Sequence, residues 1–311
     1  MRMSGLRLLR IGSRGSALAL RQAEMVKENL INVHQGLQAV LVPIKTSGDK
    51  IKGSLAEFGG KGLFVKEIET ALLSGHIDVA VHSMKDLPGE LPAGLVIAAV
   101  PNREDPRDVL ISREGKSLLE LPSGARLGTS SVRRKAQLLA RRCDLVLLPL
   151  RGNLDTRLRK LKEQGLDGIV VAAAGLKRMG WEHAISHYLS PEEFIPAIGQ
   201  GALAIETRAE DEWALGVVSC LNCETSFQEV AAERAFARGL QAGCQVPVAA
   251  FAQVKEGTLY LVGLVISLDG KRAYSGDLSG PPFQASHLGL ELAHHLLAQG
   301  ADEVLKEFRT Q

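Results

Sequence analysis

Short apolar runs alternate with longer amphipathic stretches over the first two thirds of the chain. Runs rich in Val, Ile and Leu predict buried strands at residues 6–11, 40–43, 79–82, 96–100, 109–111, 145–148 and 169–173. Between them, apolar residues recur at helical spacing and predict helices over residues 17–30, 62–73, 132–140 and 156–162. This alternation is typical of an α/β fold with a largely buried sheet, and such folds bind ligands at the carboxyl ends of their strands.

The last third of the chain follows a different pattern. It predicts a helix over 228–240, strands at 248–254 and 259–267 that meet at Glu256-Gly257, and a helix over 289–299. This order indicates a separate α+β unit. Segments 101–106 and 191–201 interrupt the pattern, and the two prolines of the first make it a candidate interdomain linker.

Composition bounds the class of protein. The chain has 311 residues, 45% of them hydrophobic and 23% charged, and it exceeds the size of about 250 residues at which single cores stop growing, so we expect several domains. No uncharged apolar stretch of about 18 residues occurs, and the amino terminus offers no secretory core. We therefore expect a soluble, cytoplasmic protein without a membrane partner.

The four cysteines are too few and too scattered for a disulfide framework, which agrees with a reducing compartment. Cys220 and Cys223 have metal-like spacing, but two further ligands at matching spacing are missing, so we expect no metal site.

Charge is unevenly distributed along the chain. Residues 107–195 hold 16 basic and 10 acidic side chains, whereas residues 220–311 hold 7 and 10. Aromatic residues make up only 4% of the chain, and single-stranded nucleic-acid binders need them for base stacking. The basic middle segment therefore predicts small polyanionic ligands and argues against nucleic acid as a partner.

Polar residues follow several predicted strands directly. Lys85 and Asp86 come after the strand at 79–82, where a carboxylate can act as an acid, a base or a stabiliser of cations, although a solvated turn would look the same. Gly128-Thr129-Ser130-Ser131 opens a helix that carries Arg133 and Arg134. Free backbone donors, hydroxyls and guanidinium groups converge there, as in an anion site, while a capped helix with a basic face is the alternative.

The same arrangement recurs at other strand ends, with Arg151, Gly152 and Arg157 after one strand and Arg178 after the next. At the front of the chain, Arg14 and Ser16 lie between a strand and a helix. Arginines that follow successive strand ends favour a ligand with many carboxylates.

Lys61 lies in a glycine-rich segment that is not a phosphate-binding P-loop, because Leu55 stands where that motif needs its first glycine. Cys244 lies in Gly243-Cys244-Gln245-Val246-Pro247, where small neighbours leave room for a bulky group at the sulfur. On residue type alone, Cys244 also fits a buried structural thiol.

Taken together, these motifs resemble the porphobilinogen deaminase family, from about Arg10 to the end of the chain. The resemblance rests on Lys61-Gly62-Leu63-Phe64, His82-Ser83-Met84-Lys85-Asp86-Leu87-Pro88, Gly128-Thr129-Ser130-Ser131 with Arg133-Arg134, Arg151-Gly152-Asn153, Gly199-Gln200-Gly201-Ala202 and Gly243-Cys244-Gln245-Val246-Pro247, in the family's order.

The resemblance implies three domains and an α/β fold. Domain 1 would be a catalytic lobe of residues 1–101 and 199–219, domain 2 a basic lobe of residues 106–194, and domain 3 a cofactor-anchoring α+β domain of residues 225–311. The first two would have mixed sheets like the lobes of a periplasmic binding protein. The implied enzyme is a monomeric transferase of tetrapyrrole biosynthesis, hydroxymethylbilane synthase.

The implied reaction joins four porphobilinogen molecules head to tail, with loss of ammonia at each step, on a dipyrromethane cofactor held through a thioether to Cys244. The resemblance implies Asp86 and Lys85 as catalytic residues. The residues implied in cofactor binding are Cys244, Lys85, Asp86, Ser131, Arg133, Arg134, Arg151 and Gly152. Those implied in substrate binding are Arg14, Ser16, Lys61, Phe64, Arg157, Arg178 and Gln200.

The chain departs from the family at Glu57, often basic in relatives, and at Ala242, often glycine; neither position is one that the chemistry requires. Two other classes of function stay open from the residues alone. A two-lobed anion sensor would use the arginines without needing Cys244 or Asp86, and an RNA-binding protein would show steep salt dependence of its affinity.

Overall fold

The computed structural model describes residues 7–50, 65–241 and 246–309. Contacts within the chain divide it into two compact units, Met1–Arg103 with Ala202–Phe227, and Glu104–Gly201 with Gln228–Gln311. We refer to these as unit 1 and unit 2. The three-domain boundaries expected from the sequence stay a prediction.

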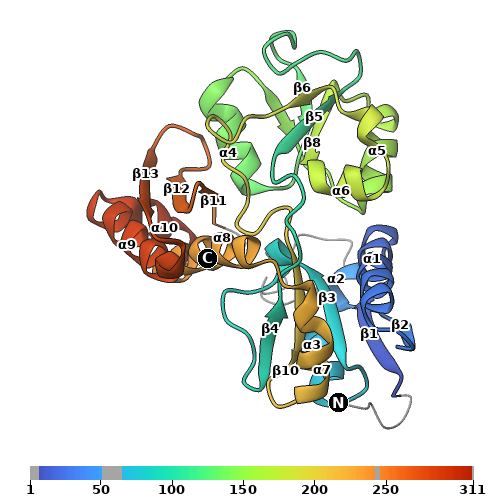
Figure 1. The fold of residues 1–311 in the computed structure, drawn as a ribbon. Helices are drawn as coiled ribbons and strands as arrows, with labels where there is room; N and C mark the ends of the chain where they lie inside the picture. The colour runs from blue at the N-terminus through green and yellow to red at the C-terminus, as the bar shows by residue number, and fades with distance from the viewer. Residues whose placement is uncertain (1–6, 51–64, 242–245, 310–311) are drawn as a thin grey trace. The chain divides into compact units, whose positions relative to one another are not determined.

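Unit 1 is built on a five-stranded mixed sheet in the order β2-β1-β3-β10-β4 (Figure 1). Its strands are β1 (Leu9–Arg14), β2 (Ala39–Ile44), β3 (Val79–Ser83), β4 (Leu95–Ala99) and β10 (Leu203–Arg208). Strands β1, β2 and β3 are parallel, and β10 lies between β3 and β4 and runs antiparallel to both. The carboxyl ends of β1, β2 and β3 therefore share one edge of the sheet.

Helices cover both faces of this sheet because alternate strand residues on each face are apolar. Leu9, Ile11 and Val79 pack with α1 (Ala17–Val33) and α7 (Glu212–Val218) on one face. On the other face, Ile77 and Ala80 pack with α3 (Lys66–Leu73). Unit 1 also holds the short α2 (Ser47–Lys50) and the one-turn helix η4 (Ser219–Leu221).

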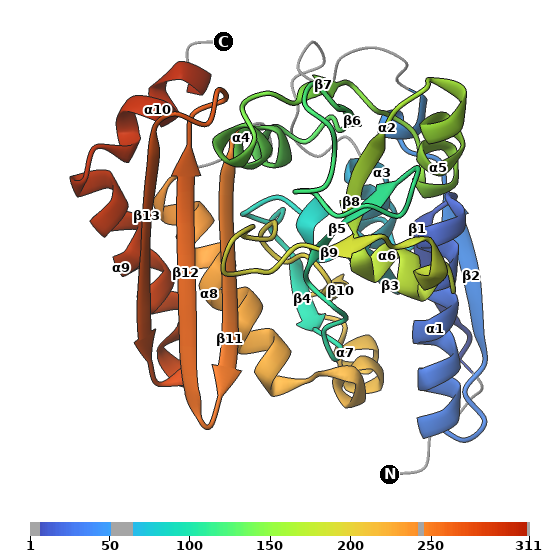
Figure 2. The ribbon, with the colours of Figure 1, turned by 90° about the horizontal axis from the view of Figure 1, so that it is seen from above.

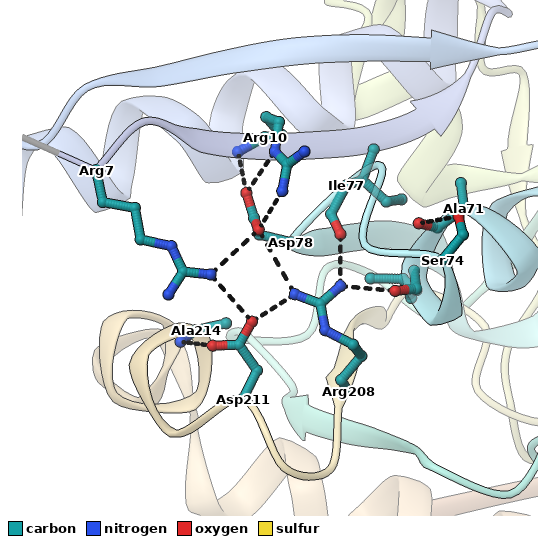
Figure 3. A network of polar contacts seen from close by, with 10 residues as sticks. Arg7, Arg10, Ala71, Ser74, Ile77, Asp78, Arg208, Asp211 and Ala214 are labelled. Atoms are coloured by element: carbon teal, nitrogen blue, oxygen red, sulfur yellow. Dashed lines mark hydrogen bonds and ion pairs between the residues drawn. The ribbon is translucent and has the colours of Figure 1, made fainter.

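A network of buried ion pairs lies at the end of this sheet where β1 and β3 begin (Figure 3). Asp78 is fully buried and accepts from Arg10 at 2.8 and 2.9 Å, with Arg7 and Arg208 each at 3.5 Å. Burial opposes ionisation, but the hydrogen bonds and charge of Arg10 outweigh it and lower the pKa of Asp78. The network lies at the end of the sheet opposite to the carboxyl ends of β1 and β3.

Unit 2 repeats the same plan in its first part, with the strand order β7-β6-β8-β5-β9. Its strands are β5 (Asp108–Ser112), β6 (Arg126–Gly128), β7 (Val146–Leu148), β8 (Gly168–Ala172) and β9 (His187–Tyr188), with α4 (Val132–Arg141), α5 (Leu154–Glu163), α6 (Ala173–Arg178) and η3 (Glu182–Ala184). Strands β6, β7 and β8 are parallel, and β5 is antiparallel to β8.

The rest of unit 2 is a three-stranded antiparallel sheet, β11-β12-β13, with helices along it (Figure 2). Its elements are α8 (Glu224–Gly239, which begins in unit 1), β11 (Val248–Lys255), β12 (Thr258–Ile266), β13 (Ala273–Gly280), η5 (Pro282–Gln284), α9 (Ala285–Ala298) and α10 (Ala301–Arg309). Helices α8, α9 and α10 share a core with one face. On the other face, Ala249 and Leu264 pack against Ala136 of α4.

The expected fold class is confirmed, since two mixed α/β sheets are joined to a smaller α+β part. The described residues include no helix with the length and apolarity needed to cross a membrane.

Candidate functional site

In unit 1, the end of β1 presents Arg14 at the shared carboxyl edge of the parallel strands. The following Ser16 is the N-cap of α1, where its hydroxyl accepts from the backbone N–H of Ala19 at 3.3 Å. Both side chains are partly exposed. The capping role of Ser16 accounts for its hydroxyl without a ligand.

Lys85 and Asp86 lie at the same edge, because β3 ends at Ser83 and passes directly into a one-turn helix, η2 (Met84–Asp86). The turn is tied to β10 by the bond from the Met84 N–H to the Ala202 carbonyl at 3.0 Å, and it closes with the Leu87 N–H on the Met84 carbonyl at 3.1 Å. Met84 is buried, Lys85 is partly buried and Asp86 is exposed. The turn thus anchors its first residue in the core and presents the carboxylate to solvent.

In unit 2, the expected anion-binding turn follows β6 and opens α4. Ser131 is the N-cap and accepts from the Arg134 N–H at 3.4 Å, and its own N–H donates to Thr129 Oγ1 at 3.2 Å. Ser130 both donates to the Leu150 carbonyl and accepts from the Leu150 N–H. The three hydroxyls therefore organise the turn itself.

The turn after β7 contains Arg151 and Gly152, and Arg157 of the following helix α5 bonds back to it. Gly152 has φ +114°, which favours glycine, and a Cβ there would lie 2.6 Å from Thr156. Arg157 Nε donates to the Gly152 carbonyl at 2.8 Å. Arg151 is partly exposed. Since β6 and β7 are parallel, this turn lies at the same sheet edge as Ser131.

Arg133 and Arg134 do not face solvent. Both are buried and both bind the fully buried Asp108 at the start of β5, each at 2.7 Å. Gln200 joins them, with its amide donating to Asp108 Oδ1 at 3.0 Å. Burial raises the pKa of Asp108, but the charges of Arg133 and Arg134 outweigh it and lower that pKa to about 2.

Arg178 closes α6, and its Nη2 donates to the Gly201 carbonyl at 2.6 Å. Burial lowers the pKa of Arg178 to about 10, an effect that the charge of Glu104 partly offsets. Arg178 is therefore a partly buried cation beside the segment that carries Gln200.

Four expected or doubtful positions, Glu57, Lys61, Phe64 and Ala242, lie outside the described residues, as does Cys244. The described residues bring together Arg14, Lys85 and Asp86 at one end of the sheet in unit 1, and Ser131, Arg151 and Gly152 at one end of the sheet in unit 2.

Two buried acids of the structure are absent from the sequence-based expectations. One is Asp108, for which an acid that opens an apolar strand is a usable signal. The other is Glu206; it interrupts an apolar run and its Oε2 lies 3.0 Å from His82 Nε2 in the core. Nothing local in the sequence indicates that pairing, because the two residues are 124 positions apart.

Comparisons with known proteins identify the family. Residues 9–215 match the model described as porphobilinogen deaminase, dipyromethane cofactor binding domain, and residues 227–298 match porphobilinogen deaminase, C-terminal domain.

Relatives cover nearly the full chain. The porphobilinogen deaminase of Syntrophotalea carbinolica is 55% identical over 96% of this chain and 95% of its own length. That of Syntrophomonas wolfei is 52% identical over 98% of this chain and 100% of its own. Among solved structures, an arginine-specific periplasmic binding protein of Salmonella typhimurium aligns over 69% of this chain and 91% of its own at 15% identity, with a TM-score of 0.41, a likeness from which nothing is concluded.

Proposed function

The chain belongs to the porphobilinogen deaminase family, and from this premise we propose that Asp86 and Lys85 carry out its chemistry while Cys244 holds its cofactor. The enzyme is a transferase that deaminates four porphobilinogen molecules and joins them head to tail into hydroxymethylbilane. Its cofactor is dipyrromethane. The assignment of individual residues is our proposal.

The donors at the two sheet edges fit such a cofactor and substrate. Each pyrrole ring carries an acetate and a propionate, and guanidinium and ammonium groups are the strongest partners for carboxylates. Arg14 and Lys85 in unit 1, and Arg151 and Arg157 in unit 2, are at least partly exposed at strand ends. When bound, dipyrromethane supplies the free pyrrole ring to which porphobilinogen is joined.

Asp86 is the residue that suits the reacting ring. Loss of ammonia from porphobilinogen leaves a cationic pyrrole, and a carboxylate near the ring nitrogen stabilises that charge. The short helix η2 fixes Asp86 relative to the sheet while leaving it exposed. Lys85, its neighbour, would hold a substrate carboxylate and so orient the ring.

The arginines divide into two groups by burial. Arg14, Arg151 and Arg157 are partly exposed, so carboxylates of a ligand could reach their guanidinium groups from solvent. Arg133, Arg134 and Gln200 are engaged with Asp108, so a role in cofactor binding would act through the α4 turn at Ser131 or need one of these bonds to open. Arg178 would bind the ligand with the part of its guanidinium group that does not bond to the Gly201 carbonyl.

The observation that carries the proposal is the exposed carboxylate of Asp86 on a turn anchored to the sheet. Asp86→Asn keeps the shape and removes the charge, so we expect kcat to fall about 100- to 1,000-fold with the thermal unfolding temperature unchanged. Glu90→Gln, an exposed acid four residues further on, is the matched control and should retain wild-type turnover. Turnover of Asp86→Asn within twofold of wild type would remove Asp86 from the mechanism.

We also propose that the enzyme works as a cytoplasmic monomer, with porphobilinogen as its partner and neither nucleic acid nor membrane. The low aromatic content leaves few side chains on which nucleic-acid bases could stack, which supports the absence of a nucleic-acid partner. The few, scattered cysteines support a reducing compartment. Light scattering on the purified protein tests the monomer, and a dimer mass at micromolar concentration would refute it.

A further inference from the structure

A group of three titratable side chains is buried in unit 1, away from the exposed residues of the site. His82 Nε2 lies 3.0 Å from Glu206 Oε2, and the two side chains are 3% and 0% exposed. Glu69 of α3 is also buried, and its charge interacts with both. These three residues, which we call the acid–histidine cluster, come from α3, β3 and β10. Their arrangement is not that of a metal site, and no metal-holding group of three occurs among the described residues.

The register of the sheet explains how the cluster forms. Ala204 lies directly opposite His82, and Glu206 lies opposite Ala80. Because residues two apart share a face, Glu206 reaches His82 diagonally across the small Ala204. The α3 face around them is otherwise apolar, with Ile68, Leu72, Ile77 and Leu95 beside Ala80.

Among the described residues, other charges on the elements that pack here are few. Strand β4 carries none, and on α3 Lys66 is exposed while Glu67 bonds to Ser47. On β1, Arg14 lies two residues beyond Gly12, which is paired with Ala80, so Arg14 is level with His82. On β10, Arg208 binds the carbonyls of Leu72 and Ile77 at the other end of α3.

The cluster is costly for stability. One oxygen of Glu69 and one of Glu206 are buried without a hydrogen-bond partner among the described residues. Burial first, and then the charge of Glu206, raise the pKa of Glu69, while His82 lowers it. An apolar group would fill these positions more favourably, so stability does not explain the acids.

The cluster is connected to the site along β3. Ser83 ends β3 one residue after His82, and the η2 turn with Lys85 and Asp86 follows. The pairing of β3 with β10 continues through Ser83 and Leu203 to the bond between Met84 and Ala202. A change in the bond from His82 to Glu206 thus acts on the strand end from which Asp86 projects.

We propose that His82 and Glu206 are positioning residues for the Lys85–Asp86 turn. This proposal rests on the role of Asp86 given above. The contact between His82 and Glu206 holds the end of β3 against β10. Loss of that contact lets the turn shift relative to the sheet and displaces Asp86 from the reacting ring.

The test is the measurement of kcat and KM for the holoenzyme variants Glu206→Gln and His82→Gln, after intact mass has confirmed that each carries its cofactor. Each variant removes one partner of the buried contact. Misplacing Asp86 should lower kcat about 10- to 100-fold with KM within about threefold.

A second readout is independent of activity. Amide hydrogen exchange at Met84 and Leu87 should accelerate at least tenfold in Glu206→Gln, since both amides are bonded within the turn. Asp78→Asn is the matched control, because Asp78 is a buried acid at the other end of the same strand. It should lower the unfolding temperature but leave kcat and these two amides unchanged.

The outcomes separate the two proposals. Wild-type kcat and exchange in both cluster variants, with Asp86→Asn inactive, overturn the positioning role alone. Active Asp86→Asn overturns the role of Asp86 and this inference with it. If Glu206→Gln fails to fold, His82→Gln still decides the matter, because it removes the other partner of the same contact.

Discussion

Asp108 determines what Arg133 and Arg134 can do. A carboxylate that is fully buried is costly unless it is paired, and two guanidinium groups pair with it at 2.7 Å. The reverse also holds, since burial lowers the pKa of Arg133 and the charge of Asp108 opposes that shift. The three side chains are stable only as a set.

Asp108→Asn should therefore destabilise the protein by about 3–5 kcal/mol, because it leaves two buried cations without their counter-charge. The measurement is chemical denaturation at neutral pH. Ser112→Ala, at the other end of β5 and also buried, is the control and should cost about 1 kcal/mol. Equal losses in the two variants would contradict the pairing.

The ionisation of Asp108 also makes the stability of the protein depend on pH in the acid range. Its folded-state pKa of about 2 lies below the usual value for Asp, so its contribution is fully present above about pH 4 and is lost as the pH falls towards 2. Wild type should lose more stability than Asp108→Asn over this range. Parallel pH curves for the two proteins would show that Asp108 is not ionised in the fold.

At the level of elements, the surroundings of two helical glycines show where helices pack closely. A Cβ on Gly289 of α9 would lie 2.2 Å from the Ala232 carbonyl of α8, whereas a Cβ on Gly216 of α7 would contact nothing within 4 Å. Both glycines are helical, but only Gly289 is packed against another helix. We therefore expect the same substitution to have opposite effects on stability at the two positions.

Gly289→Ala should destabilise by about 1–3 kcal/mol because α8 and α9 are forced apart. Gly216→Ala should stabilise by about 0.5 kcal/mol, since alanine favours a helix and finds open space. Thermal unfolding of both variants beside wild type measures the difference. A stabilised Gly289→Ala would contradict the close packing of these helices.

The sequence predicted most elements, and β10 and β13 are among those it missed. Strand β10 follows a segment interpreted as a break, and its apolar pattern is interrupted by Glu206, whose partner His82 is 124 positions away. Strand β13 is an edge strand with alternately exposed positions and few apolar residues. Strand β1 runs from Leu9 to Arg14 instead of 6–11, because pairing with β2 extends through polar Ser13 and Arg14.

The site residues show the same division. The turns at strand ends were predictable because local signals, such as the serines before α4, mark where a helix begins. Whether an arginine there meets solvent or a buried acid depends on nonlocal pairing. Arg133 and Arg134 meet Asp108, 25 and 26 positions away, while Arg151 stays partly exposed.

Across the whole molecule, two sheets repeat one strand order, and each includes one strand that runs antiparallel to its parallel strands. Strand β10 completes the sheet of unit 1 only after the chain has formed the first sheet of unit 2. Each sheet presents basic and hydroxyl side chains at the carboxyl ends of its parallel strands. This arrangement suits a chain of pyrroles with many carboxylates.

The central claim is that this enzyme builds its product on a cofactor bound to Cys244. The most direct test is the intact mass of the purified protein under denaturing conditions, beside Cys244→Ser, because a covalent adduct survives unfolding. We predict an excess equal to two linked pyrrole units in the wild type and none in the variant. An unmodified wild-type mass that persists after incubation with porphobilinogen, or an adduct that remains in Cys244→Ser, would contradict the account.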